Sequence, residues 1–157
     1  MKVKNFDYYI YLDYSENLVG YNIIEKEKIP SILPNIVKFR HYKGEIHKRI
    51  YLIKIKREIK KSNLRSLMLK QKIGYIKDNL ILFAEVLEFV KKNDNCIIFM
   101  SVDNNQYNAF LKLFRMIPHQ SHVLVLKESD LKKESVEYKL SLIIDTMLNI
   151  ERLELSK

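Results

Sequence analysis

The stretch Cys96–Val102 constrains the fold of this chain most, because six of its seven residues are apolar. A short apolar run that stops at a polar residue is typical of a strand buried on both faces of a sheet. An amphipathic helix is predicted before it over Leu80–Val90, and another after it over Tyr107–Ile117. A second short strand is predicted over His122–Leu126. Since a helix that joins two neighbouring strands makes them parallel, these segments predict a parallel strand pair with helices packed against it.

The beginning of the chain predicts a β-hairpin. From Phe6 to Ser15 the residues alternate with a period of two and have high β-propensity. Glu16-Asn17 offers a turn, and Leu18–Ile24 resumes the β character. Because Cys96–Val102 must be covered on both faces, we expect Phe6–Asp13 to lie beside it, in parallel, at the centre of the sheet.

A second hairpin is predicted around Lys43-Gly44, with Val37–Tyr42 and Ile46–Ile55 as its arms. In the longer arm Lys54 and Lys56 alternate with apolar residues, so one face of this strand would be buried and the other basic. From about residue 62 the pattern becomes helical, and the last helix is predicted over residues 135–152.

Basic residues are concentrated in the middle of the chain. The 157 residues carry a formal charge of +9, and the segment 38–77 holds 14 Lys and Arg against two acidic residues. A localised basic block on a nearly neutral body is typical of an anion-binding face, for which DNA or RNA is the commonest partner. A solvated face, or the Lys- and Ile-rich composition of a heat-adapted protein, is the alternative. The predicted nucleic-acid-binding residues are Lys48, Arg49, Lys54, Lys56, Arg57, Lys60 and Lys61.

Length and composition exclude several classes of protein. A chain of 157 residues predicts a single domain, 1–157, with the basic hairpin and helix around 36–77 as an insertion. The longest apolar runs fall far short of the roughly 20 residues of a membrane helix, and no signal peptide is recognisable, so we expect a cytoplasmic protein. A single cysteine allows neither an internal disulfide nor a thiolate zinc site, and three isolated glycines disfavour a phosphate-binding loop.

Two short motifs resemble the ribonuclease H-like superfamily. Tyr11-Leu12-Asp13-Tyr14-Ser15 is similar to the Asp-x-Ser signature of the family's first strand, and Val102-Asp103-Asn-Asn-Gln-Tyr107 is similar to its Thr-Asp-Ser-x-Tyr element. The order of predicted elements also matches, over most of the chain. The resemblance implies an α+β (α/β) fold: a mixed sheet of about five strands, an antiparallel meander followed by a parallel β-α-β unit, with helices packed on it.

The resemblance also implies a Mg²⁺ or Mn²⁺ site made of carboxylates, since two divalent ions about 3.5–4 Å apart drive hydrolysis in that class. It assigns Asp13 and Asp103 as catalytic metal ligands, with Glu137 as a further catalytic ligand and Asp78 completing the metal site. Three of these acids have an ordinary alternative, and for Glu137 it is a favourable interaction with the helix dipole alone. Asp13 would be a polar residue at a strand end, and Asp103 would be the N-cap of the following helix. The family's helix glutamate falls near Asn79, which has no carboxylate.

Three functions follow from these patterns. The first is a nucleic-acid-associated, metal-dependent nuclease. The second is a non-catalytic module on the same scaffold that binds nucleic acid or a protein, and the missing helix glutamate favours it. The third is an assembly subunit that docks its basic segment on an acidic protein. Carboxylates gathered within reach of one cation would favour the enzyme, and scattered ones the binding module.

Overall fold

The computed structural model describes residues 5–118 and 122–156 of the chain. The N-terminal hairpin forms as predicted, from β1 (Tyr8–Ser15) and β2 (Leu18–Glu25), which pair antiparallel with Ser15 opposite Leu18. Glu16 makes the turn with a positive φ of 54°. The predicted hairpin is therefore confirmed.

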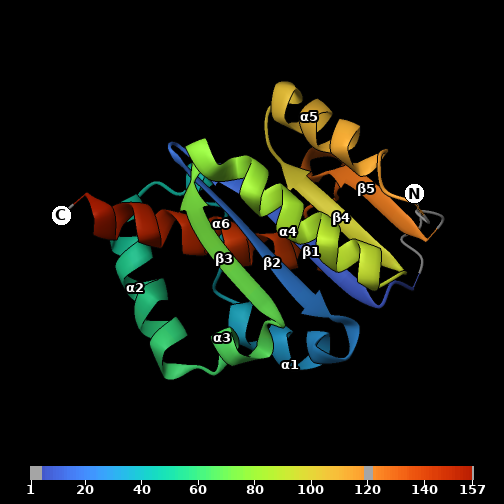
Figure 1. Ribbon diagram of the computed structural model, residues 1–157. Coiled ribbons are helices and arrows are strands. Elements are labelled where there is room, and N and C mark those ends of the chain that lie inside the picture. The colour runs from blue at the N-terminus through green and yellow to red at the C-terminus, as the bar shows by residue number, and fades with distance from the viewer. Residues whose placement is uncertain (1–4, 119–121, 157) are drawn as a thin grey trace.

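Five strands form one mixed sheet, in the order β3-β2-β1-β4-β5 (Figure 1). The strands β4 (Cys96–Ser101) and β5 (Val123–Lys127) continue from β1 in parallel, with Tyr8 opposite Cys96. On the other side, β3 (Lys70–Tyr75) pairs antiparallel with β2. The prediction that the first strand lies centrally and parallel to the apolar stretch is confirmed.

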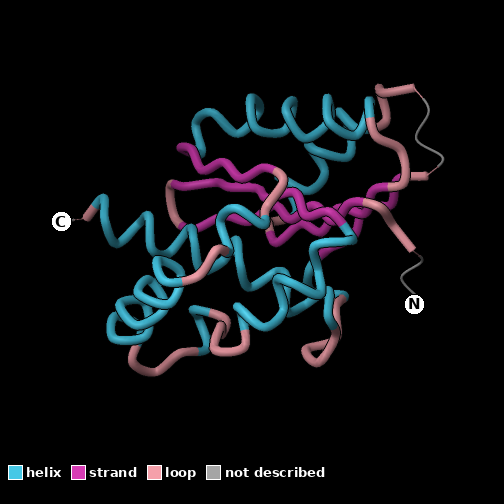
Figure 2. Tube along the Cα trace, turned by 90° about the horizontal axis from the view of Figure 1, so that it is seen from below, coloured by secondary structure: helices cyan, strands magenta, loops and turns pink. Residues whose placement is uncertain are grey.

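Helices cover both faces of the sheet, as Figure 2 shows edge-on. One face packs against α4 (Asn79–Lys92) and α5 (Asn104–Phe114), and its core includes Ile10 and Leu12 of β1. The opposite face packs against α6 (Val136–Leu155), α2 (Lys48–Lys61) and the single turns α1 (Ile29–Ile32) and α3 (Leu64–Leu67). Tyr9 and Tyr11 of β1 belong to this second core, so successive residues of β1 alternate between the two layers.

The predicted second hairpin is wrong. Residues 37–47 form a loop with a 3₁₀ turn, and residues 48–61 form the helix α2. Tyr51, Ile55 and Ile59 fit a strand period as well as a helical one, but Leu52, buried next to Tyr51, fits only the helix. Ile53, which a strand would have buried, is 41% exposed. The third strand of the meander is instead Lys70–Tyr75, within the region predicted as helix.

The helix predicted over Leu80–Val90 is confirmed as α4. Its predicted apolar stripe was Leu80, Phe83, Ala84, Leu87 and Val90, and the buried face differs from it. Leu80 is exposed, while Leu82 and Val86 are buried with Phe83 and Leu87. Within residues 5–118 and 122–156 no helix is long and apolar enough to span a membrane.

Candidate functional site

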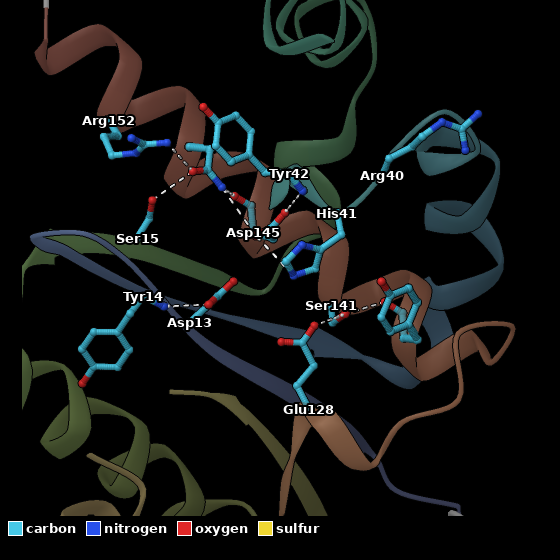
Figure 3. A network of polar contacts seen from close by, with 12 residues as sticks. Asp13, Tyr14, Ser15, Arg40, His41, Tyr42, Glu128, Ser141, Asp145 and Arg152 are labelled. Carbon is cyan, nitrogen blue, oxygen red and sulfur yellow. Dashed lines mark hydrogen bonds and ion pairs between the residues drawn. The ribbon is translucent and has the colours of Figure 1, made fainter. Parts of the chain in front are cut away.

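Three acidic residues from separate elements face one another on the α6 side of the sheet. Asp13 comes from β1, Asp145 from α6 and Glu128 from the 3₁₀ turn that follows β5. Figure 3 shows their carboxyl groups arranged around a common space with the His41 ring. Asp13 is only 5% exposed and Asp145 only 6%. We call these three residues the acidic centre.

Close packing of α6 on the hairpin brings Asp145 to Asp13. Gly20 of β2 lies opposite Asp13 in the strand register. A Cβ atom on Gly20 would lie 3.0 Å from Cδ1 of Ile144 and 3.1 Å from Cδ2 of Leu148. The missing side chain therefore lets α6 approach the sheet at the level of Asp13.

Burial and like charges act together on Asp13. Burial raises the pKa of its carboxyl well above the ordinary value, and the negative charges of Asp145 and Glu128 raise it further. Hydrogen bonds from the Tyr14 backbone N–H, at 2.7 Å, and from the Ser101 side chain favour the ionised form and act against this. Because burial and repulsion prevail, Asp13 holds its proton at higher pH than an exposed aspartate does.

The loop before α2 partly compensates Asp145. Burial raises the pKa of Asp145, while the Tyr42 backbone N–H, donating to Oδ2 at 3.0 Å, and the charge of His41 lower it. His41 Nε2 lies 3.9 Å from Asp145 Oδ1. The loop 37–47, which we predicted as part of a hairpin, thus supplies the polar partners of Asp145 in the acidic centre.

A chain of hydrogen bonds continues from Asp145 along α6. Asn149 donates to the Asp145 carbonyl at 2.7 Å, and its own Oδ1 accepts from Ser15 at 2.9 Å and from Arg152 at 3.0 Å. The Arg152 guanidinium stacks on the Tyr42 ring at 5.2 Å. These residues line a pocket of about 380 Å³ that opens beside Asp145.

The other three acids predicted from the resemblance each lie at the start of a helix. Asp103 is the N-cap of α5, and its Oδ1 accepts the Gln106 backbone N–H at 2.8 Å. Asp78 occupies the position before α4. Glu137 lies in the first turn of α6, and its charge acts on Tyr9 and Tyr11. None of these three acids is among the charges that shift the pKa of Asp13.

Asn79, near which the resemblance implies a glutamate, belongs to a cluster of uncharged polar side chains. Asn79 Nδ2 donates to Gln106 Oε1 at 2.6 Å, and the Tyr14 hydroxyl donates to the same oxygen at 3.2 Å. This cluster ties β1, α4 and α5 together without a carboxylate. In the described part of the chain no three His, Cys, Asp or Glu residues are placed to hold one metal ion. The residues present do not fit the Mg²⁺ or Mn²⁺ pair that the resemblance implies.

The sequence contained a signal for Asp145 that the prediction missed. Ser141, Asp145 and Asn149 repeat at intervals of four residues within 140–150, a stretch of α6 that is otherwise apolar except for Thr146, and all three are buried. Polar residues at helical spacing on a buried face indicate a polar site, because burial without partners is costly. Glu128 carries no comparable signal, since it lies in a turn whose position depends on the whole sheet.

The basic residues predicted to bind nucleic acid all lie on α2. This helix buries Tyr51, Leu52, Ile55 and Ile59 against the core and carries seven basic residues and one acidic residue. Lys56 pairs with Glu154 of α6. The other six basic residues are exposed: Lys48, Arg49, Lys54, Arg57, Lys60 and Lys61. They form a surface that we call the α2 face.

The α2 face and the acidic centre share the loop between them. The Tyr51 hydroxyl of α2 accepts from the Arg40 backbone N–H at 2.6 Å and donates to its carbonyl at 2.9 Å. The next two residues, His41 and Tyr42, contact Asp145. A ligand bound on α2 would therefore lie close to the loop that holds Asp145.

Comparison with known proteins supports the fold and no narrower identity. No protein-family model matches the chain, and the search of curated proteins gives no match. Among solved structures, it is similar to a chain of the PCNA:RNase HII complex from Archaeoglobus fulgidus, with a TM-score of 0.53 and 11% sequence identity. The match covers 93% of this chain and 72% of the other. At this identity the likeness supports a ribonuclease H-like fold alone.

Proposed function

We propose that this protein binds nucleic acid through the α2 face. The observation that carries the proposal is the placement of six exposed Lys and Arg side chains on one helix, with a single acidic residue in it. Phosphate groups are the anions that such a surface attracts, and each neutralised phosphate releases condensed counterions. The ribonuclease H-like scaffold agrees with a role on nucleic acid.

Salt dependence tests this proposal. If about five or six phosphates are neutralised, the logarithm of the association constant for duplex DNA should fall with the logarithm of salt concentration with a slope of roughly −5. The slope is measured by fluorescence anisotropy of a labelled duplex at NaCl concentrations from about 50 to about 300 mM. Absence of binding at the lowest salt would contradict the proposal and favour an acidic protein as the partner of the α2 face.

A second candidate function is hydrolysis of the bound nucleic acid at the acidic centre. The close approach of Asp13, Asp145 and Glu128 favours this function. Burial and repulsion between their charges make it costly for the folded protein to hold them together. Such costly clusters occur where a protein needs them for chemistry. We assign no step to a metal ion, because the described residues offer no group of three ligands for one.

Cleavage assays distinguish the acidic centre from a site that depends on Asp103. We expect cleavage of DNA or RNA that is lost in Asp13→Asn, in Asp145→Asn and equally in the double variant, as for residues that act as one unit. Asp103→Ala should keep cleavage and lose about 0.5–2 kcal/mol of stability, the usual cost of removing an N-cap. Wild-type protein without cleavage, or cleavage that survives in Asp145→Asn, would contradict hydrolysis at this centre.

A further inference from the structure

The helix α2 lies at the outer edge of the molecule (Figure 1). Two hollows flank it, so that it forms a ridge between them. On one side a hollow of about 520 Å³ separates it from the loop 37–47, with Lys38, Arg40, Lys54 and Lys61 in its lining. On the other side a hollow of about 230 Å³ separates it from the end of α6, with Lys56 and Lys60 in its lining. Cationic side chains therefore lie along both flanks of the helix.

Two of these cations are partly neutralised by ion pairs. Lys38 Nζ lies 3.6 Å from Glu58 Oε1, and Lys56 pairs with Glu154. The remaining positive charge on both flanks still exceeds the negative charge of the lining acids Glu45, Glu58 and Glu154.

The crest of the ridge is apolar. Ile50 is 57% exposed and Ile53 is 41% exposed. Because Ile53 and Lys54 follow Ile50 by three and four residues, these three side chains share the solvent side of α2. Arg57 follows one turn later on the same side. What distinguishes these two isoleucines from other exposed apolar residues is the cations on both sides of them, a pattern that complements an anionic partner with apolar groups between its charges.

The major groove of duplex DNA has this combination of features. It is about 12 Å wide and admits an α-helix of about 10–12 Å diameter, and α2, with 14 residues, is about 21 Å long. The two phosphate strands of the groove would flank the helix on the sides where its cations lie. The thymine C5-methyl group is the apolar group that the floor of the groove presents.

We propose that α2 enters the major groove of duplex DNA, with Ile50 and Ile53 against thymine methyl groups and the flanking cations against both phosphate strands. This inference rests on the proposed nucleic-acid binding and adds the kind of nucleic acid and the groove. A duplex RNA fits poorly, because its major groove is too deep and narrow for a helix. A second copy of this chain fits poorly as well, because two basic helices repel each other.

Uracil in place of thymine provides a direct test, since it removes only the methyl group from the major groove. Anisotropy with an alternating A·T duplex and the matching A·U DNA duplex should show about four- to fifteenfold weaker binding to the latter, the effect of one or two buried methyl groups. A duplex RNA of the same length should bind at least about tenfold more weakly than the A·T duplex.

Variants connect the methyl effect to α2. The double variant Ile50→Ser/Ile53→Ser should bind the A·T duplex more weakly and no longer distinguish it from the A·U duplex. The matched control Leu80→Ser/Ile81→Ser changes two exposed apolar residues of α4 and should behave as wild type. Circular dichroism checks that both variants fold, and the wild-type comparison of the two duplexes holds whether or not they do.

The outcomes separate this inference from the proposal on which it rests. Equal, salt-dependent binding of wild type to the A·T and A·U duplexes would overturn major-groove entry and leave nucleic-acid binding intact. Binding to neither duplex at low salt would overturn both.

Discussion

Reversing three charges on the α2 face is expected to weaken nucleic-acid binding at least about a hundredfold at 100 mM salt. The variant is Lys54→Glu/Arg57→Glu/Lys61→Glu, whose three side chains are exposed on the same side of α2. Each substitution removes an attraction to phosphate and adds a repulsion, and binding of this kind rests mainly on such contacts. Lys56 is left unchanged because its pair with Glu154 joins α2 to α6.

The control for this variant carries the same change in net charge elsewhere. Lys91, Lys112 and Lys132 are exposed and lie outside α2, so their triple replacement by Glu should reduce affinity by only a few fold through the overall field. Equal losses in the two triple variants would show that net charge alone drives binding, and would remove α2 as the site.

Replacing Asp13 by asparagine is expected to stabilise the protein at neutral pH. The pKa of Asp13 is raised by its burial and by Asp145 and Glu128, so the folded state holds a proton that the unfolded state releases. Its contribution to stability is therefore complete below the ordinary aspartate pKa of 3.8 and is lost as pH rises through the raised value. Asparagine resembles the protonated form and carries no such loss.

We expect Asp13→Asn to raise the free energy of unfolding by roughly 1–3 kcal/mol at pH 8, the usual cost of a buried polar group whose interactions do not offset its burial. At about pH 3 we expect no change, because the Asp13 carboxyl is protonated there. Thermal unfolding measured across this pH range provides the comparison. Asp103→Asn is the control, because asparagine is as good an N-cap as aspartate. If Asp13→Asn were destabilised at every pH, favourable contacts would hold the Asp13 carboxylate. That result would contradict the raised pKa of Asp13.

The centre of the sheet could be predicted from the sequence because its signal is local and strong. An apolar run such as Cys96–Val102 has few places in a fold, and the alternation in Phe6–Ser15 fits only a strand. The segment 46–55 was ambiguous, since Tyr51 and Ile55 satisfy both periods over a short window. Burial of both Tyr51 and Leu52 in one core decides for the helix, because neighbouring residues of a strand point to opposite faces.

The candidate site was predictable only in part. Asp13 and the basic residues of α2 were identified from local patterns, although the latter were placed on the wrong kind of element. The partners of Asp13 come from residues 128 and 145, more than a hundred positions away, and their convergence depends on how closely α6 packs on Gly20. The family motif assigned Asp103 to the metal site, whereas the local capping geometry places it at a helix start.

Amide chemical shifts of ¹⁵N-labelled protein, followed by NMR during titration with a duplex DNA at about 100 mM salt, test the central claim most directly. The account predicts that the largest changes occur at Ile50, Lys54, Arg57 and Lys61 of α2 and in the adjoining loop 37–47, with α4 and α5 nearly unchanged. Largest changes on α4, α5 or the edge strand β3, with α2 unaffected, would contradict it.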